Sequence, residues 1–374
     1  MRYSNEDKLN IFMSLAFEGA ARSGMQFVEA NGELCETHAR VLDGSADYGN
    51  LGMEKRRRIA LCANESYLED FIAGLERDEI RAITKTDPLY PPLLLNIPDP
   101  PYVLYARGAM AESPIASPVS AVGTRRCSDY GRTVADMMGR TLSENGATVI
   151  SGLAYGCDSY AHEGALKSER SPYPTAAVLG QGVLVSKSDN TQKTLEKILE
   201  RGVILSEYLP RTKATQYSFP MRNRIISGIS PALLVIEAGK KSGTMITVSC
   251  ALEQGRDVYA VPCRITEQLN CGTNDMLKKG WAQPVYGAED LVEMLGLARE
   301  RAESHTVSNG AASAAKTLSG DVRIVYETLL LGEKSIDELL EKTEIPQEKL
   351  ILHLTELEFS GLIKQLPCRV YSAE

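Results

Sequence analysis

The sequence lacks the cysteine and histidine patterns that mark metal sites and disulfide frameworks. Its eight cysteines are scattered without a Cys-x-x-Cys pair, and its four histidines are equally dispersed. Structural zinc ligands recur at short spacings, and disulfide frameworks are typical of small secreted chains. We therefore expect neither a bound metal nor a disulfide, and we assign no metal ligand.

Long apolar runs are missing as well. No stretch reaches the length of a membrane-spanning helix, and the opening residues, MRYSNEDKLN, contain no signal-peptide core. These two absences predict a protein without a membrane segment that works in the reducing cytoplasm.

An excess of positive charge is the third thing that the sequence lacks. The 374 residues carry a formal net charge of -8, which argues against a generally basic nucleic-acid binder. Any contact with nucleic acid would therefore depend on a local patch of cations. The length predicts two or three domains, and 43% hydrophobic with 24% charged residues is the composition of an ordinary soluble protein with a sizeable core.

Residues 1–86 are predicted to form a small helical domain. Apolar residues recur at helical spacing in LNIFMSLAF, MEKRRRIALC and YLEDFIAGLE. The basic run Lys55-Arg56-Arg57-Arg58 either contacts phosphates or forms the solvated face of a helix. After this domain, the prolines of DPLYPPLLLNIPDPPYVLYARG exclude a helix and predict an extended segment that ends in a short strand.

From Ser117 onward, strands and helices alternate. Six apolar strands are predicted, in PVSAVGTR, ATVISGLA, TAAVLGQG, GVILSEYL, PALLVIEA and DVYAVPC. Strands this apolar, separated by crossover helices, predict an α/β fold with a mostly parallel sheet that is covered on both faces. The prediction for residues 87–302 is an extended Rossmann-like domain with its functional loops at the carboxyl ends of the strands.

The amino-acid composition and periodicity change twice in the last part of the chain. Residues 303–320 are small and polar without periodicity, which predicts a flexible linker. Residues 321–374 then give three amphipathic helices and a terminal pair of strands, with Ser335 and Pro346 placed to begin two of the helices. This order of elements predicts a winged-helix domain.

The loop after the first strand of the Rossmann-like domain lacks the dinucleotide fingerprint G-x-G-x-x-G. We therefore expect no dinucleotide cofactor, and no other cofactor is indicated. The loop instead offers Gly123, the Thr124 hydroxyl and the guanidinium groups of Arg125 and Arg126 close to a helix N-terminus. This combination suits phosphate oxygens, and the alternative is a tight turn with surface arginines.

The second strand ends at Ser151 and Gly152, where a close backbone approach is expected. Asp158 is predicted to cap the following helix, and His162 to lie on a face of that helix. The two side chains could also form an acid–base pair, but no nucleophile stands near them in the sequence.

Two later segments supply more cations. Arg222 and Arg224 follow Pro220 at the start of a helix, and Lys240, Lys241, Ser242, Gly243 and Thr244 form the turn after the next strand. Because loops after parallel strands emerge at one edge of a sheet, we expect these groups to converge with Gly123–Arg126 on an anion site. The alternative for Arg222 and Arg224 is a structural salt bridge with Glu207 or Glu237.

Seven segments in a fixed order resemble the DNA-processing protein A (DprA, or Smf) family. They are AVGTRRCSDYG, SGLAYGCDSYAHEGAL, AAVLGQG, LSEYLP, FPMRNRIISGIS, VIEAGKKSGTMIT and GRDVYAVPC. The similarity covers roughly Asp87 to Tyr286, and its lead-in is YPPLLLNIPDPPYVLYARG.

The resemblance implies a Rossmann-like core, often with a small helical N-terminal domain of SAM or helix-hairpin-helix type and a winged-helix C-terminal domain. It further implies a homodimer that binds single-stranded DNA, protects it and helps to load the RecA recombinase in natural transformation, without catalysis. By similarity, the DNA-binding residues include Arg125 of the G-[ST]-R loop, Phe219, Arg222 and Asn223 of the F-P-x-R-N-R motif, Lys241, Ser242 and Gly243 of the K-S-G turn, and Lys187.

This sequence departs from the family pattern at several positions. Val185 and Ser186 replace a Tyr-Pro pair ahead of Lys187, Tyr155 replaces an arginine, and Cys263 replaces a glycine. A tyrosine at position 155 removes one cation but offers a ring on which a base can stack.

An enzyme is the rival interpretation. Phosphoribohydrolases of the lysine-decarboxylase-like family also combine a Rossmann-like fold with a G-[ST]-R loop, followed by a Gly-Gly-x-Gly-Thr turn and a glutamate. Here Met245, Ile246 and Thr247 stand where the acidic catalytic residue would fall, so the carboxylate is missing.

The C-terminal domain is acidic. Residues 321–374 contain eleven Asp or Glu and six Lys or Arg residues, and the candidate recognition helix PQEKLILHLTELEFSG is poor in cations. Since winged helices that read duplex DNA present a basic helix, we expect a protein-interaction or regulatory role here instead.

Overall fold

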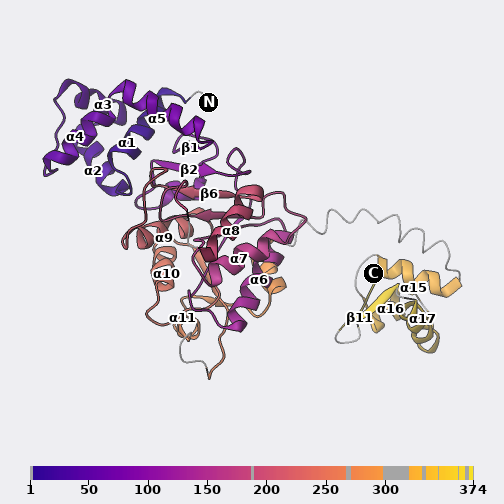
Figure 1. The fold of residues 1–374 in the computed structure, drawn as a ribbon. Helices are drawn as coiled ribbons and strands as arrows, with labels where there is room; N and C mark the ends of the chain where they lie inside the picture. Colours follow the sequence, from indigo (N-terminus) through magenta and orange to yellow (C-terminus); the bar gives the residue numbers. More distant parts are fainter. Residues whose placement is uncertain are drawn as a thin grey trace. The chain divides into compact units, whose positions relative to one another are not determined.

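The structure is a computed structural model that describes residues 3–186, 189–266, 271–297, 320–330, 334–343, 345–360, 362–366 and 370–373. The chain divides into two compact units, residues 1–298 and 299–374 (Figure 1). The predicted linker at 303–320 lies outside the described residues except for its last residue, Gly320.

The first unit begins with five helices and continues with a nine-stranded sheet. The helices are α1 (Asn5–Ala16), α2 (Ala21–Asn31), α3 (Leu34–Asp43), α4 (Met53–Cys62) and α5 (Glu65–Arg77). The strands are β1 (Arg81–Thr84), β2 (Val103–Arg107), β3 (Pro118–Val122), β4 (Thr148–Ser151), β5 (Thr175–Val178), β6 (Val203–Ser206), β7 (Ala232–Val235), β8 (Asp257–Ala260) and β9 (Gln283–Pro284).

The sheet has the strand order β1-β2-β6-β5-β4-β3-β7-β8-β9. Its seven strands from β6 to β9 pair in parallel, and β2 and β1 add an antiparallel edge. The connections are η1 (Pro92–Asn96), α6 (Asp129–Glu144), α7 (Cys157–Leu166), α8 (Asp189–Arg201), α9 (Ser218–Ile229), α10 (Thr244–Glu253), α11 (Gly272–Lys278) and α12 (Ala288–Met294). The prediction of a Rossmann-like, mostly parallel sheet is confirmed.

Alternate residues of each strand face opposite layers of helices, because successive side chains of a strand point to opposite sides. On one face, Val122 and Leu233 join a buried cluster with residues of α9, α10 and η1. On the other face, Val119 and Leu234 pack with α6, α7 and α12. Figure 1 shows α9, α10 and α11 on one side of the sheet and α6, α7 and α8 on the other.

The five N-terminal helices share a core with one end of the sheet. Phe12 and Leu15 of α1 belong to the same buried cluster as Tyr105 of β2 and Ile204 of β6. The Tyr105 and Ser14 hydroxyl groups, 3.0 Å apart, add a buried hydrogen bond between the two parts. The helices are therefore packed onto β1 and β2 within a single unit (Figure 1).

The basic run of α4 is used within the protein. Lys55 lies over the Phe17 ring, and Arg56 donates to the carbonyl oxygens of Leu51 and Gly49. Arg58 donates to Leu15 O and pairs with Glu18. Arg57 and Arg58 are exposed, as the solvated-face alternative expects, whereas Lys55 and Arg56 are half-buried against the protein.

All six predicted apolar strands are present, and the short strand in YVLYARG is β2. The prediction missed β1 and β9. β9 has two residues, which are too few to show a strand period, and it ends at Pro284 on the edge of the sheet. β1 has four residues, as β4 to β8 do, but it follows α5 after only three residues, so the sequence does not set it apart from the helical segment.

The second unit contains α15 (Gly320–Leu330), β10 (Lys334–Ser335), α16 (Ile336–Thr343), α17 (Gln347–Phe359), β11 (Ile363–Leu366) and β12 (Val370–Ala373). Its strands form an antiparallel sheet in the order β10-β12-β11. Ser335 accepts from Glu338 N at 3.3 Å and so caps α16 as predicted, and Pro346 precedes α17. Val325, Leu339, Leu350 and Leu354 contribute to a core of its own.

Candidate functional site

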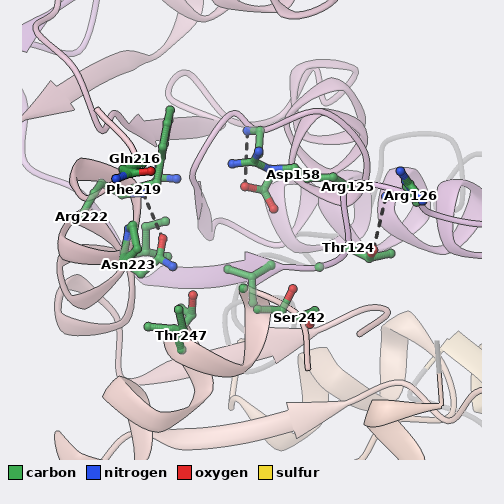
Figure 2. A pocket seen from close by; sticks show the side chains of 18 residues that line it. Thr124, Arg125, Arg126, Asp158, Gln216, Phe219, Arg222, Asn223, Ser242 and Thr247 are labelled. Carbon is green, nitrogen blue, oxygen red and sulfur yellow. Dashed lines mark hydrogen bonds between the residues drawn. The ribbon is translucent and has the colours of Figure 1, made fainter. Parts of the chain in front are cut away.

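Loops at the carboxyl ends of β3, β6 and β7, together with Ala154 and Asp158 after β4, surround a hollow of about 680 Å³. Figure 2 shows side chains of these loops around it. The hollow is lined by Val122, Gly123, Thr124, Arg125, Arg126, Ala154, Asp158, Gln216, Phe219, Pro220, Arg222, Asn223, Ile226, Ser242, Gly243, Thr244, Ile246 and Thr247. The sheet thus brings together segments that lie more than a hundred residues apart in the sequence.

The first wall is the loop that follows β3. Gly123 must be a glycine, because a Cβ there would lie 2.5 Å from the side chain of Cys157. Thr124 N donates to Glu237 O at 2.8 Å, and Thr124 Oγ1 accepts from Arg126 N at 3.2 Å. The turn is fixed by these bonds, whereas the side chains of Arg125 and Arg126 are exposed.

The second wall is the first two turns of α9. Arg222 is only 4% exposed, and its Nη1 donates to Gly152 O at 2.8 Å and also to Val178 O. Its Nε donates to Asn223 Oδ1 at 3.2 Å. Burial lowers the pKa of Arg222 to about 10, although the nearby Asp158 raises it, so the guanidinium remains charged at neutral pH.

An aromatic ring stands between these two walls. The Arg125 guanidinium lies 5.5 Å from the centre of the Phe219 ring. A planar cation over a ring leaves a flat surface, and such surfaces accept nucleobases by stacking.

The third wall is the turn after β7 and the start of α10. Ser242, Gly243 and Thr244 line the hollow, and so do Ile246 and Thr247 in the first turn of the helix. The first turns of α9 and α10 both border the hollow, and helix N-termini favour anions. Lys240 and Lys241 are exposed beside the turn, and Lys240 Nζ lies 3.1 Å from Asp275 Oδ2.

The expectation that Asp158 caps α7 is wrong. The residue before α7 is Gly156, and Asp158 Oδ2 instead accepts from Gly152 N at 3.2 Å and Ala154 N at 3.4 Å. Burial raises the pKa of Asp158, and Arg222 and the backbone donors oppose that shift. The carboxylate therefore holds together the loop after β4.

His162 lies on α7, as expected, and its side chain is fully buried. Its Nδ1 lies 2.6 Å from the Thr175 hydroxyl, which in turn donates to Val149 O at 2.7 Å. The imidazole thus links α7 to β5 and, through the Thr175 hydroxyl, to β4.

Several of the predicted site residues do not line the hollow. Ser151 is buried and donates to Ala121 O at 2.5 Å, and Gly152 contributes the carbonyl oxygen that receives Arg222. Arg224 is 6% exposed and pairs with Asp99 at 2.9 Å and Glu207 at 2.6 Å, so the salt-bridge alternative describes it. Lys187 lies outside the described residues.

The structure also adds lining residues that the sequence did not point to, including Gln216 and Thr247. Thr247 could have been found, because it lies three residues after Thr244 on a helix and so shares its face. Gln216 gave no such signal, since it belongs to the irregular segment before α9.

The order of these elements and their loops agrees with one family. The model of the DNA recombination-mediator protein A family matches residues 81–296. The chain belongs to this family. The resemblance identified from the sequence is confirmed, and the family match includes all three walls of the hollow.

Known members align over most of their length. Protein Smf of Escherichia coli (strain K12) is 31% identical over 306 residues, which cover 80% of this chain and 79% of that protein. DNA processing protein DprA of Bacillus subtilis (strain 168) is 32% identical over 247 residues, or 64% of this chain and 82% of that protein.

Two solved structures of the family share the fold. DNA processing protein A from Streptococcus pneumoniae aligns with a TM-score of 0.58 and 27% identity, over 78% of this chain and 98% of that one. The protein from Helicobacter pylori, whose structure concerns its single-stranded DNA binding mode, aligns with a TM-score of 0.52 and 28% identity over 58% of this chain and 95% of that one.

Two further properties concern only the part of the chain that the structure describes. No group of three or more His, Cys, Asp or Glu side chains there could hold a metal ion. None of the helices in that part is both long and apolar enough to cross a lipid bilayer.

Proposed function

We propose that this protein binds single-stranded DNA in the hollow and acts as a recombination mediator that protects the strand and helps to load RecA in natural transformation. The observation that carries the proposal is the convergence of Arg125, Arg126 and Arg222 with two helix N-termini on a single hollow. We further propose that it works as a homodimer and catalyses no reaction.

In this proposal, different residues contact the phosphate backbone and the bases of the DNA. Exposed Arg125 lines the hollow, and exposed Lys241 directly precedes the lining residue Ser242, so both can contact phosphates. The starts of α9 and α10 add backbone donors. The Phe219 ring offers a face for a base, and Asn223 and Gln216 offer amides to its edge. Since stacking surfaces accept every base, we expect little sequence preference.

Arg222 has a supporting role in this proposal. Its guanidinium holds the carbonyl oxygens at the ends of β4 and β5 and is nearly buried, so it contributes positive potential rather than a flexible contact. Arg224 and Lys240 already pair with carboxylates. We therefore expect the phosphate contacts to come from Arg125, Arg126 and Lys241.

The hollow does not suit the rival hydrolase chemistry. Ile246 and Thr247 line it at the positions where the phosphoribohydrolases carry their carboxylate. Asp158, the acidic residue of the lining, is bound by backbone N–H groups. Release of a free base from a nucleoside monophosphate by the purified protein would contradict this part of the proposal.

The related proteins also support the proposal of single-stranded DNA binding. The Helicobacter pylori structure describes a single-stranded DNA binding mode, and the family is named for recombination mediation. For the acidic C-terminal unit we propose a winged-helix domain that contacts protein rather than duplex DNA. Binding of duplex DNA by residues 320–374 at moderate salt would overturn this.

The test of the DNA site is a salt series with a labelled single strand. The double variant Arg125→Glu plus Lys241→Glu removes two proposed phosphate contacts. Its affinity at 0.1 M salt should fall by roughly 20-fold or more, and the slope of log K against log salt should flatten by about 1.4, since each contact contributes about 0.7.

The matched control is Arg57→Glu plus Lys193→Glu, which changes the net charge equally at two exposed sites on α4 and α8. The control should bind like the wild type. Equal loss in both variants would show a general charge effect, and an unchanged affinity and slope in the first variant would exclude the hollow as the DNA site.

A further inference from the structure

Two cysteines lie side by side beneath the first wall of the hollow. Cys127 ends the β3 loop immediately before the N-cap residue of α6, and Cys157 is the first residue of α7. Both are free thiols in the structure. The Cys157 thiol donates a hydrogen bond to Cys127 Sγ, and both side chains pack in the cluster between α6, α7 and the sheet.

The two cysteines contact or adjoin the turn that carries Arg125 and Arg126. The Cys157 side chain lies against Gly123, and Cys157 N donates to Thr124 O at 3.2 Å. At the other end of the loop, Cys127 directly follows Arg126 in the sequence. A bond between the two sulfur atoms would close a covalent ring of residues 127–157 and would fix the Cys127 end of the loop beside Cys157, which already contacts the loop at Gly123 and Thr124.

The two thiols differ in access and in acidity. Cys127 is half-buried, whereas Cys157 is fully buried. The hydrogen bond from Cys157 lowers the pKa of Cys127 to about 7, against the effects of burial and Glu237. The same interaction, together with burial, raises the pKa of Cys157. Cys127 is thus the nucleophile at neutral pH, and Cys157 is the resolving thiol.

We propose that Cys127 and Cys157 form a redox pair whose reversible oxidation to a disulfide tethers the Gly123–Cys127 loop and weakens DNA binding in the hollow. The oxidant is a peroxide, and the reductant is a dithiol.

The chemistry balances with one peroxide for each disulfide. The Cys127 thiolate attacks one oxygen of hydrogen peroxide and breaks the O–O bond, which gives a sulfenic acid and a hydroxide. The hydroxide takes up the proton that Cys127 lost to solvent and becomes the first water. Cys157 Sγ then attacks Cys127 Sγ and expels the hydroxyl group, which leaves as a second water with the Cys157 proton. Two thiols are oxidised by two electrons in total, and a dithiol returns both electrons by exchange.

The disulfide would change the first wall because an S–S bond is about 2.05 Å long, much shorter than a hydrogen-bonded contact between two thiols. Cys127 must then move toward the buried Cys157 and draw Arg126 and Arg125 with it. The approach of Arg125 to Phe219 would change as well. Loss of one phosphate contact on a single strand corresponds to about a fivefold weaker affinity at 0.1 M salt.

The covalent half of the proposal is tested without DNA. The full-length protein is treated with hydrogen peroxide, remaining thiols are blocked, and the tryptic peptides are identified by mass. We expect residues 127–132 linked to residues 141–167, and release of the two peptides by dithiothreitol. Absence of this linked pair after oxidation of the other exposed thiols, such as Cys35, would overturn the proposal.

The predicted effect of oxidation on DNA binding rests on the proposed function. The following test distinguishes failure of the redox switch from failure of the proposed function. Oxidised wild type should bind single-stranded DNA about fivefold more weakly than reduced wild type, whereas Cys127→Ser and Cys157→Ala should bind equally in both states. Cys35→Ser, which removes an exposed thiol outside the pair, should behave like the wild type. Equal loss in the Cys127 and Cys157 variants would contradict the switch, and reduced protein that binds no DNA would contradict only the proposed function.

Discussion

Arg222 and Arg224 are two residues apart on α9 but have different environments. Successive helical residues are about 100° apart, so side chains at this spacing point to nearly opposite faces. Arg222 turns to the carbonyl oxygens beside the hollow, whereas Arg224 turns to Asp99 and Glu207. The spacing in the sequence predicts that they differ, but it does not say which of them faces the hollow.

Replacement of Arg224 by methionine should destabilise the protein without changing its DNA site. Removal of one member of a buried ion pair leaves Glu207 without compensation and costs about 3–5 kcal/mol. Urea unfolding measures the loss, and DNA titration of the folded variant should give wild-type affinity. The second change Glu207→Gln should restore part of the stability. A stable Arg224→Met variant with weak DNA binding would contradict this assignment.

The Cys127 thiol should react at lower pH than an ordinary cysteine. Its thiolate is stabilised by the hydrogen bond from Cys157, and Arg132 adds to this while Glu237 opposes it. The rate of alkylation by iodoacetamide, followed by mass, should therefore rise with pH through a midpoint near 7. In Cys157→Ala the midpoint should move up by about 1 unit or more, because the donor is gone. An unchanged midpoint would exclude the hydrogen bond as the cause.

At the scale of elements, the first wall depends on how closely α6 and α7 approach. A Cβ at Gly139 of α6 would overlap Ala161 O of α7, and a Cβ at Gly164 of α7 would overlap Asp136 O of α6. These two glycines allow the backbones to touch. α6 begins at Asp129, just after the Gly123–Cys127 loop, and α7 begins at Cys157, whose side chain lies against Gly123. The separation of the two helices therefore also sets the position of the arginines.

Substitution of Gly139 by alanine should push the two helices apart. Overpacking of this kind typically costs about 1–3 kcal/mol. Thermal unfolding measures the loss, and DNA affinity should fall because the loop is displaced. The control is Gly74→Ala in α5, where the nearest neighbour of a new Cβ is the tip of Arg77 at 3.8 Å. Alanine there should stabilise the helix by up to about 1 kcal/mol, and similar effects at both positions would contradict the packing argument.

Much of the architecture could be predicted because it depends on local pattern. The six apolar strands show as uninterrupted runs, and their parallel order places Gly123–Arg126, α9 and the turn at Ser242 at the same edge. Individual side-chain contacts could not be predicted, because they depend on which groups the fold brings close to a residue and not on its neighbours in the sequence. Nothing in the sequence near Arg58 shows that it would bind Leu15 O, or that Asp158 would hold the loop before it.

At the scale of the whole molecule, the two units should differ in their ability to fold alone. The helices of residues 1–80 share their buried cluster with Tyr105, Ile198 and Ile204, whereas the second unit has its own core. A fragment of residues 320–374 should therefore unfold cooperatively on heating, and a fragment of residues 1–80 should not. Circular dichroism measures both transitions, and a cooperative transition in the N-terminal fragment would contradict the shared core.

The order of strands in the sheet has a consequence for synthesis of the chain. β2 pairs with β6, so Tyr105 meets Ser206 only after a further hundred residues have been made. At about 5–20 residues per second, this interval lasts roughly 5–20 s. During that time α1, α5 and β2 can pack on one another, but their buried cluster lacks Ile198 and Ile204. The first helices to leave the ribosome are thus among the last to reach their native packing, and this interval is when the nascent protein is most exposed to aggregation.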